Sequence, residues 1–229
     1  MIKQILHLAI ATTLILGLVS CKKSYFIPGE WVDLGLPSGL LWYSVNLGAT
    51  SPEGYGNYYA WGETSTKSDY SWSTYAYGRG YYQLTKYCGN SSHGLNGFTD
   101  NLTTLQAADD AATVVLGRGA RIPTIAEWQE LVENTSSEWM TLNGVYCLKL
   151  TASNGNSLFL PAAGYWEGSE PYRGECGYYW SSLLNTDDPA NALCVDLFYH
   201  PYARIWYDDD DCVRHIGLPV RAVRSMRKN

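Results

Sequence analysis

Aromatic and acidic side chains are interleaved late in the sequence, and their types suggest a binding chemistry. They fall in the stretches 165–172 (Tyr-Trp-Glu-Gly-Ser-Glu-Pro-Tyr), 199–202 and 206–207, with further acids close by. The C–H face of a sugar ring stacks on an aromatic ring, while its hydroxyls donate hydrogen bonds to carboxylates. We therefore predict a ligand site formed by Tyr172, Tyr202, Trp206 and Asp208. The alternative is ordinary sheet packing, because Tyr and Trp also favour strands.

Strand alternation adds a detail to this prediction. In a strand over 203–207, Ile205 marks the side that faces the core, so Arg204 and Trp206 fall on the opposite, outer side. A large indole on an outer side is expected to be covered by a ligand, by a partner or by neighbouring loops.

Catalytic groups are sparse in this sequence. It has four histidines, one of them (His7) in an apolar leader, and it lacks a Gly-x-Ser-x-Gly motif. We expect His93, His200 and His215 to lie in turns or at the surface, although a Ser/His/Asp arrangement remains open. The prediction is a protein that is not an enzyme and has no cofactor.

Metal binding is not predicted either. The run of four aspartates at 208–211 could offer oxygen ligands to a hard cation, but between two predicted strands it is typical of a solvated turn. No two cysteines have a C-x-x-C spacing, so neither a zinc site nor a thioredoxin-like motif is indicated.

Six cysteines raise the question of disulfides. Cys21 is set apart by its place at the end of the leader, and the pairing of the other five is open: Cys88, Cys147, Cys176, Cys194 and Cys212. An odd number cannot all pair within one chain. In a simple meander Cys194 and Cys212 lie two strands apart, roughly 9–10 Å, which is too far for a disulfide. We therefore expect these two not to pair.

The N-terminus resembles that of bacterial lipoproteins. A short basic start and an apolar run lead to Leu18-Val19-Ser20-Cys21, which is similar to a lipobox. The resemblance implies cleavage of a signal peptide over 1–20 and acylation of Cys21, with palmitate among its chains, so that a tether over 21–29 follows a lipid anchor. Because Lys22 and not Asp follows the cysteine, outer-membrane placement is favoured, on either the surface or the periplasmic side.

The charge balance excludes one class of partner. The full chain has a formal net charge of −6, and removal of the leader with its single lysine makes it −7. A nucleic-acid-binding surface is normally basic, so nucleic acid is not expected as a partner.

The remaining chain predicts an α+β domain with antiparallel sheets and two helices. Helices are expected over 105–116 and 124–134, the second marked by a capping-box spacing of Thr124 and Glu127. Trp128, on the apolar face of the second helix, is expected in the core. A long polar passage over 64–101 is unusual for a compact domain. Strands are expected over 31–34, 40–47, 58–61, 144–151, 157–166, 177–184, 192–199, 203–207 and 216–223.

Several of these stretches resemble a known family, the Fibrobacter-type major paralogous domain. The matching blocks run in order over 31–42, 46–50, 59–63, 109–112, 121–128, 158–164, 179–182 and 218–222. That family is similar to the Lcl C-terminal domain and, more distantly, to formylglycine-generating enzymes. The resemblance implies one C-type-lectin-like domain over 30–226, with Trp180 in a core strand.

What the resemblance implies for function is an envelope adhesion or binding module, often associated with fimbriae, with a glycan or extracellular-matrix ligand. A structural envelope or assembly protein without a soluble ligand is the alternative. A sulfatase-modifying type of enzyme is a minor alternative, because those relatives use two cysteines a few residues apart and the closest pair here is eighteen apart.

Overall fold

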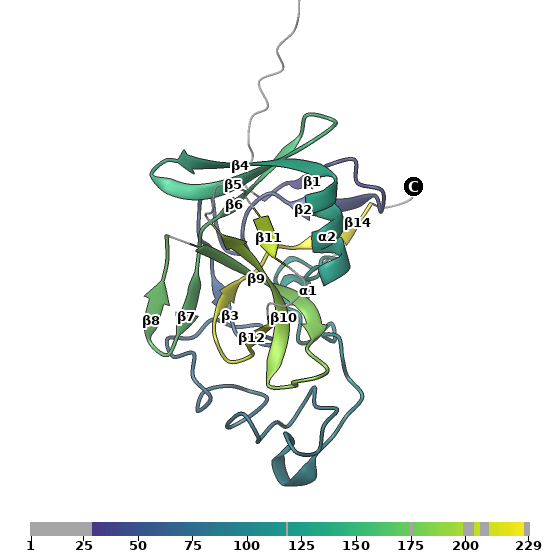
Figure 1. Ribbon diagram of the computed structural model, residues 1–229, viewed down its shortest axis with the longest axis vertical. Helices are drawn as coiled ribbons and strands as arrows, with labels where there is room; N and C mark the ends of the chain where they lie inside the picture. Colours follow the sequence, from purple (N-terminus) through teal and green to yellow (C-terminus); the bar gives the residue numbers. More distant parts are fainter. Residues whose placement is uncertain (1–28, 118, 175, 199–203, 207–210, 227–229) are drawn as a thin grey trace, which may run out of the picture.

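The computed structural model describes residues 29–117, 119–174, 176–198, 204–206 and 211–226. The predicted signal peptide, Cys21 and most of the predicted tether lie outside these ranges. The described chain is built mainly of antiparallel strand pairs with two α-helices, so the predicted α+β class is confirmed (Figure 1). Among the residues that the structure describes, no helix is both long and apolar enough to cross a membrane.

The first sheet joins the two ends of the domain. Its order is β1 (Trp31–Asp33), β2 (Leu40–Tyr43) and β14 (Val223–Ser225). Trp42 at its centre pairs with Val32 on one side and Val223 on the other. Gly39, with a φ of 68°, ends the turn between β1 and β2.

A second sheet lies across the top of Figure 1 and is made by β4 (Thr135–Leu142), β5 (Val145–Ala152) and β6 (Ser157–Pro161). A hairpin turn at Asn154-Gly155, a dipeptide typical of such turns, joins β5 to β6. β4 was not predicted, because its polar sequence lacks a regular apolar alternation. A second Asn-Gly turn joins it to β5, with positive φ at both Asn143 and Gly144.

The central sheet shows that the expectation for Cys194 and Cys212 is wrong. β9 (Cys176–Leu184) pairs with one edge of β10 (Asn191–Phe198), while β11 (Arg204–Trp206) and β12 (Asp211–Val213) follow one another along the opposite edge. β12 is therefore a direct neighbour of β10 and not two strands away. The two Cα atoms are 6.1 Å apart, within the range of a disulfide, and the thiols are joined.

Two expected strands are each broken in two. The stretch 157–166 divides into β6 and β7 (Tyr165–Glu167) at Gly164, where a Cβ atom would lie 1.6 Å from the backbone oxygen of Tyr172. The stretch 216–223 divides into β13 (Leu218–Pro219) and β14. β13 pairs with β3 (Tyr58–Tyr59), and β7 pairs with β8 (Glu170–Tyr172).

The second helix follows its prediction more closely than the first. α2 (Ile125–Glu133) starts after Thr124, and the capping box with Glu127 is present. α1 (Ala111–Leu116) begins six residues later than expected, with Asp110 as its cap. The reason is tertiary: Thr104 forms a β-bridge with Leu183, and the Leu105 N–H donates to Ser182 O, so this part of the chain is held extended.

Two core clusters lie on the two faces of the β9–β10 pair. Trp128 packs with Tyr179, Val195 and Leu197 on one face, and Trp180 packs with Cys194 on the other. Trp128 and Trp180 are fully buried, as predicted. Buried residues of the β9–β10 pair therefore lie on both faces of this central sheet.

The long passage over 64–101 contains no α-helix and only a short 3₁₀ turn at Leu95–Gly97. It nevertheless packs tightly, because Tyr70, Tyr75, Leu84 and Tyr87 are buried. The passage extends to the bottom of Figure 1, where it lies beside the β9–β10 loop.

Candidate functional site

The predicted aromatic and acidic stretch forms a small hairpin, β7–β8. The register pairs Tyr165 with Tyr172 and Glu167 with Glu170. Because side chains alternate along a strand, these four residues lie on one face of the hairpin. We call this face the Tyr–Glu face.

Two stacked rings form the apolar part of the Tyr–Glu face. The ring centroids of Tyr165 and Tyr172 are 4.8 Å apart with an interplanar angle of 18°. Tyr172 is 50% exposed, whereas Tyr165 is half-buried and meets Tyr178 edge-on at 5.7 Å. Burial, and then the charge of Glu167, raise the pKa of Tyr165, so its phenol is neutral at physiological pH. The Tyr172 ring is thus packed on Tyr165 and remains half-exposed to solvent.

The acidic part of the face is equally open. Glu167 and Glu170 are both exposed, on either side of the turn. The exposed ring can stack on a sugar, and the two carboxylates beside it can accept hydrogen bonds from the sugar hydroxyls.

The free edge of β7, the turn and the opposite face of the hairpin attach it to the domain. Trp166 exchanges two backbone hydrogen bonds of 2.8 Å with Gly217, and Gly168 exchanges two with Tyr70. The Trp166 ring meets that of Tyr58 edge-on at 5.9 Å. The hairpin is therefore fixed in place, as a recognition element needs to be.

The other predicted site residues are only partly located. Tyr202 and Asp208 lie outside the described residues, and Trp206 belongs to β11, of which only the backbone is described. The register pairs residue 206 with Asp196, and Asp196 with Tyr178. On the side of the sheet opposite Ile205, Trp180 and Cys194 of the neighbouring strands are fully buried. The side chain of residue 206 itself lies outside the described part of the chain, so the expectation for it stays a prediction.

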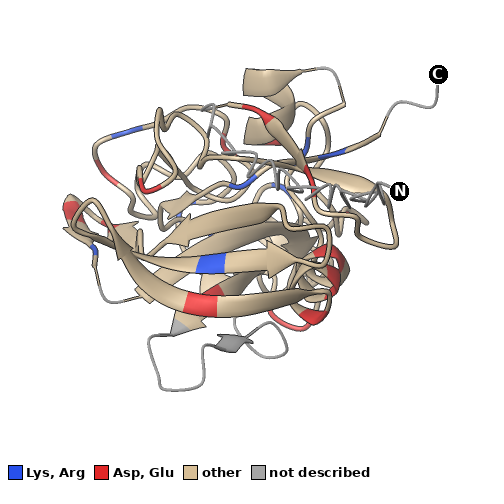
Figure 2. Ribbon diagram, turned by 90° about the horizontal axis from the view of Figure 1, so that it is seen from above, with Lys and Arg blue, Asp and Glu red and all other residues tan. Residues whose placement is uncertain are grey.

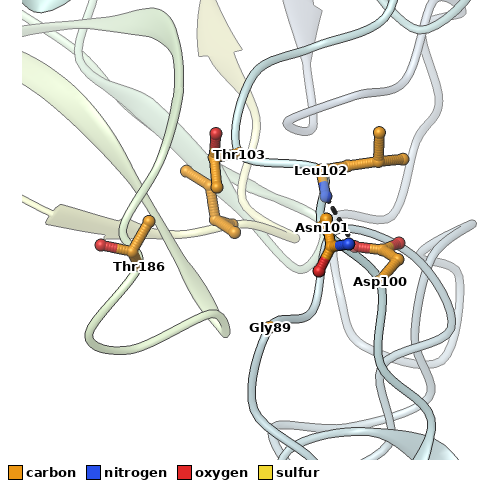
Figure 3. A pocket seen from close by; sticks show the side chains of 7 residues that line it. Gly89, Asp100, Asn101, Leu102, Thr103 and Thr186 are labelled. Atoms are coloured by element: carbon orange, nitrogen blue, oxygen red, sulfur yellow. Dashed lines mark hydrogen bonds between the residues drawn. The ribbon is translucent and has the colours of Figure 1, made fainter.

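A small pocket that the sequence did not predict lies between the long passage and the β9–β10 loop (Figure 3). It encloses about 280 Å³ and is lined by Gly89, Asp100, Asn101, Leu102, Thr103, Leu184 and Thr186. The Asp100 carboxylate is already engaged, since it accepts hydrogen bonds from the N–H groups of Tyr87, Cys88 and Leu102. The polar side chains left for a ligand are one amide and two hydroxyls.

A Ser/His/Asp arrangement is present near this pocket, but its hydrogen bonds do not suit catalysis. His93 Nε2 lies 3.4 Å from Asp188 Oδ1, and Ser92 Oγ lies 3.3 Å from His93 Nδ1. A nucleophilic serine must donate its proton to the histidine. Ser92 Oγ instead donates to Asn90 Oδ1 at 2.8 Å, and the Tyr81 hydroxyl also donates to Asp188. The arrangement fastens two loops together.

Within the described ranges, no three His, Cys, Asp or Glu side chains come close enough to hold a metal ion. The aspartates at 208–210 lie outside those ranges, and so the prediction for them is not tested. Lys and Arg are dispersed over the ribbon in Figure 2 and do not gather on one face.

Comparison of the chain with protein-family models, with curated proteins and with solved structures finds no match. The fold and the hairpin therefore carry the functional argument.

His215 lies in a turn, as expected, but it is not at the surface. It is buried, with its ring 4.7 Å from that of Trp72 and its Nδ1 without a hydrogen-bond partner among the described residues. Burial, and then the charge of Lys67, lower its pKa to about 4, while Asp69 acts in the opposite direction.

We expect acid to destabilise the protein through His215. The unfolded chain takes up this proton near pH 6.5, whereas the folded chain resists until about pH 4. Stability is thus fully present above pH 6.5 and falls by about 3 kcal/mol as the pH drops to 4. Urea unfolding of the wild type and of His215→Phe, compared at pH 7 and pH 4, measures this. A stability difference between them that stays constant with pH would refute it.

Proposed function

We propose that this chain is a lipid-anchored, non-catalytic envelope module of the C-type-lectin-like kind that recognises a glycan on the cell surface or host matrix. The observation that carries the proposal is the Tyr–Glu face: a half-exposed Tyr172 ring, stacked on Tyr165, beside the open carboxylates of Glu167 and Glu170. The anchor at Cys21 and outer-membrane placement belong to the same proposal and rest on the lipobox-like leader.

The architecture supports the lectin-like part of the proposal. Strands from both ends of the domain share one sheet, a long irregular passage departs from the body, and two helices flank the sheets. The non-catalytic part is supported by the hydrogen bonds of Ser92 and by the cysteines. Cys194 and Cys212 form a buried disulfide within a sheet, unlike a cysteine pair available for chemistry.

Substitution of Tyr172 tests the proposal. In a glycan-array screen followed by calorimetry, we expect Tyr172→Ala to weaken binding of the selected glycan at least tenfold, because a stacking surface worth about 1.4 kcal/mol is lost. Tyr172→Phe should retain most of the affinity. Since Tyr172 is half-exposed, stability should change by less than about 1 kcal/mol.

Tyr82→Ala is the matched control, because Tyr82 is a still more exposed ring (63%) on the long passage. It should bind the glycan as the wild type does. Loss of binding in Tyr82→Ala but not in Tyr172→Ala would move the ligand site to the pocket end of the molecule. Absence of binding to any glycan would leave the structural or assembly role as the better account.

A further inference from the structure

Arg173 directly follows β8, and its guanidinium lies among three aromatic rings. The guanidinium carbon is 5.4 Å from the ring centre of Tyr55, 5.2 Å from that of Tyr58 and 5.5 Å from that of Trp166. These rings come from the loop before β3, from β3 and from β7. At such distances each ring attracts the cation.

One hydrogen bond fixes the rotation of the guanidinium. Arg173 Nε donates to the Tyr58 hydroxyl at 3.1 Å, and that hydroxyl donates to Ala163 O at 2.6 Å. Burial raises the pKa of Tyr58 more than the charge of Arg173 lowers it, so the hydroxyl keeps its proton. The guanidinium is thus held by the three aromatic rings and by the hydrogen bond from Nε.

The other end of the guanidinium is open. Arg173 is exposed, and among the described residues neither Nη atom has a hydrogen bond or a carboxylate within ion-pair distance. Other arginines differ: the terminal nitrogens of Arg214 and Arg221 bind backbone carbonyls, and Arg121 pairs with Glu127. Two parallel N–H donors at a fixed position match the two oxygens of a carboxylate.

We propose that Arg173, with Tyr55 and Trp166 beside it, binds the carboxylate of an acidic sugar of the uronic-acid type. The half-buried rings of Tyr55 and Trp166 offer apolar surface next to the fork, which suits a sugar ring better than a flexible acidic peptide. This site goes beyond the Tyr–Glu face, because alternation puts Trp166 on the opposite side of the hairpin from Tyr172. The Arg173 site favours negatively charged sugars, whereas the Tyr–Glu face recognises neutral sugar rings.

Calorimetry with a short oligogalacturonate tests this inference on the intact protein. The matched ligand is the same oligomer with its carboxylates methyl-esterified. Esterification removes the negative charge and converts one of the two equivalent carboxylate oxygens into an ester oxygen, which is a poor acceptor. We expect the ester to bind at least tenfold more weakly to the wild type. Arg173→Gln should lose the acid form to the same extent, and Arg173→Lys should fall between, because it keeps the charge without the fork.

Arg79→Gln is the control variant, since Arg79 is an exposed arginine outside any ring cluster, and it should bind within twofold of the wild type. Circular dichroism and the melting temperature check that Arg173→Gln is folded. Equal affinity for the acid and the ester, or no binding of either, would overturn the inference. So would tighter binding of an acidic hexapeptide, which would indicate a peptide site.

The ester comparison does not depend on Tyr172. The Tyr–Glu face is tested by neutral glycans and Tyr172→Ala, whereas the acidic-sugar site is tested by the charge of the ligand and Arg173→Gln. Either result can therefore fail while the other stands.

Discussion

Replacing Arg214 with alanine is expected to lower the free energy of unfolding by about 3–5 kcal/mol. Arg214 has no exposed surface, and it donates to Tyr75 Oη and to the carbonyl oxygens of Lys86, Tyr87 and Pro189 at 2.8–3.0 Å. Its loss leaves these acceptors buried without donors. Urea unfolding followed by tryptophan fluorescence measures the change.

The contacts of Arg214 also predict where the damage occurs. Three of the four acceptors belong to the long passage, and the guanidinium lies over the rings of Trp61, Tyr75 and Tyr87. Amide hydrogen exchange of Arg214→Ala should therefore rise first over 75–88. Arg214→Lys should recover part of the stability, and Arg79→Ala should change it by less than about 0.5 kcal/mol. A loss below 1 kcal/mol in Arg214→Ala would contradict this role.

Removal of the Cys194–Cys212 disulfide is expected to cost about 3 kcal/mol, which is the loop-closure contribution for a separation of 18 residues. The double variant Cys194→Ala/Cys212→Ala should show the loss in denaturant unfolding. Dithiothreitol should lower the stability of the wild type by a similar amount and leave the double variant unchanged.

Thiol counting checks the same disulfide independently. The denatured, unreduced monomer without residues 1–21 has five cysteines, so one disulfide leaves an odd number of reactive thiols and at most three. Peptide mapping should recover residues 194 and 212 in one linked pair. Five reactive thiols, or a link to another cysteine, would show that the pairing is wrong.

Local signals in the sequence determined several elements of this protein. Thr124 and Glu127 define the start of α2 because a capping box involves only residues three positions apart. Asn154-Gly155 indicates the β5–β6 hairpin because Gly155 adopts a φ of 84°, which glycine accepts without strain. The α+β class and the burial of Trp128 follow from the same short-range patterns, whereas the burial of Trp180 was expected from the family resemblance.

The candidate site was only partly predictable. The sequence placed rings and acids together over 165–172, but the hairpin register decided that Tyr165, Glu167, Glu170 and Tyr172 share a face. The sequence did not indicate a role for Arg173, because two of its three aromatic neighbours lie more than a hundred residues earlier in the chain.

Only the tertiary structure decided the features that depend on such long-range neighbours. Whether β12 lies beside β10 or beyond β11 decides the Cys194–Cys212 pairing, and short-range spacing cannot distinguish these arrangements. His215 and Arg214 look like residues of a polar turn, yet the long passage folds over both and buries them. Burial depends on what packs against a residue, and for these positions the covering segment lies more than a hundred residues earlier in the chain.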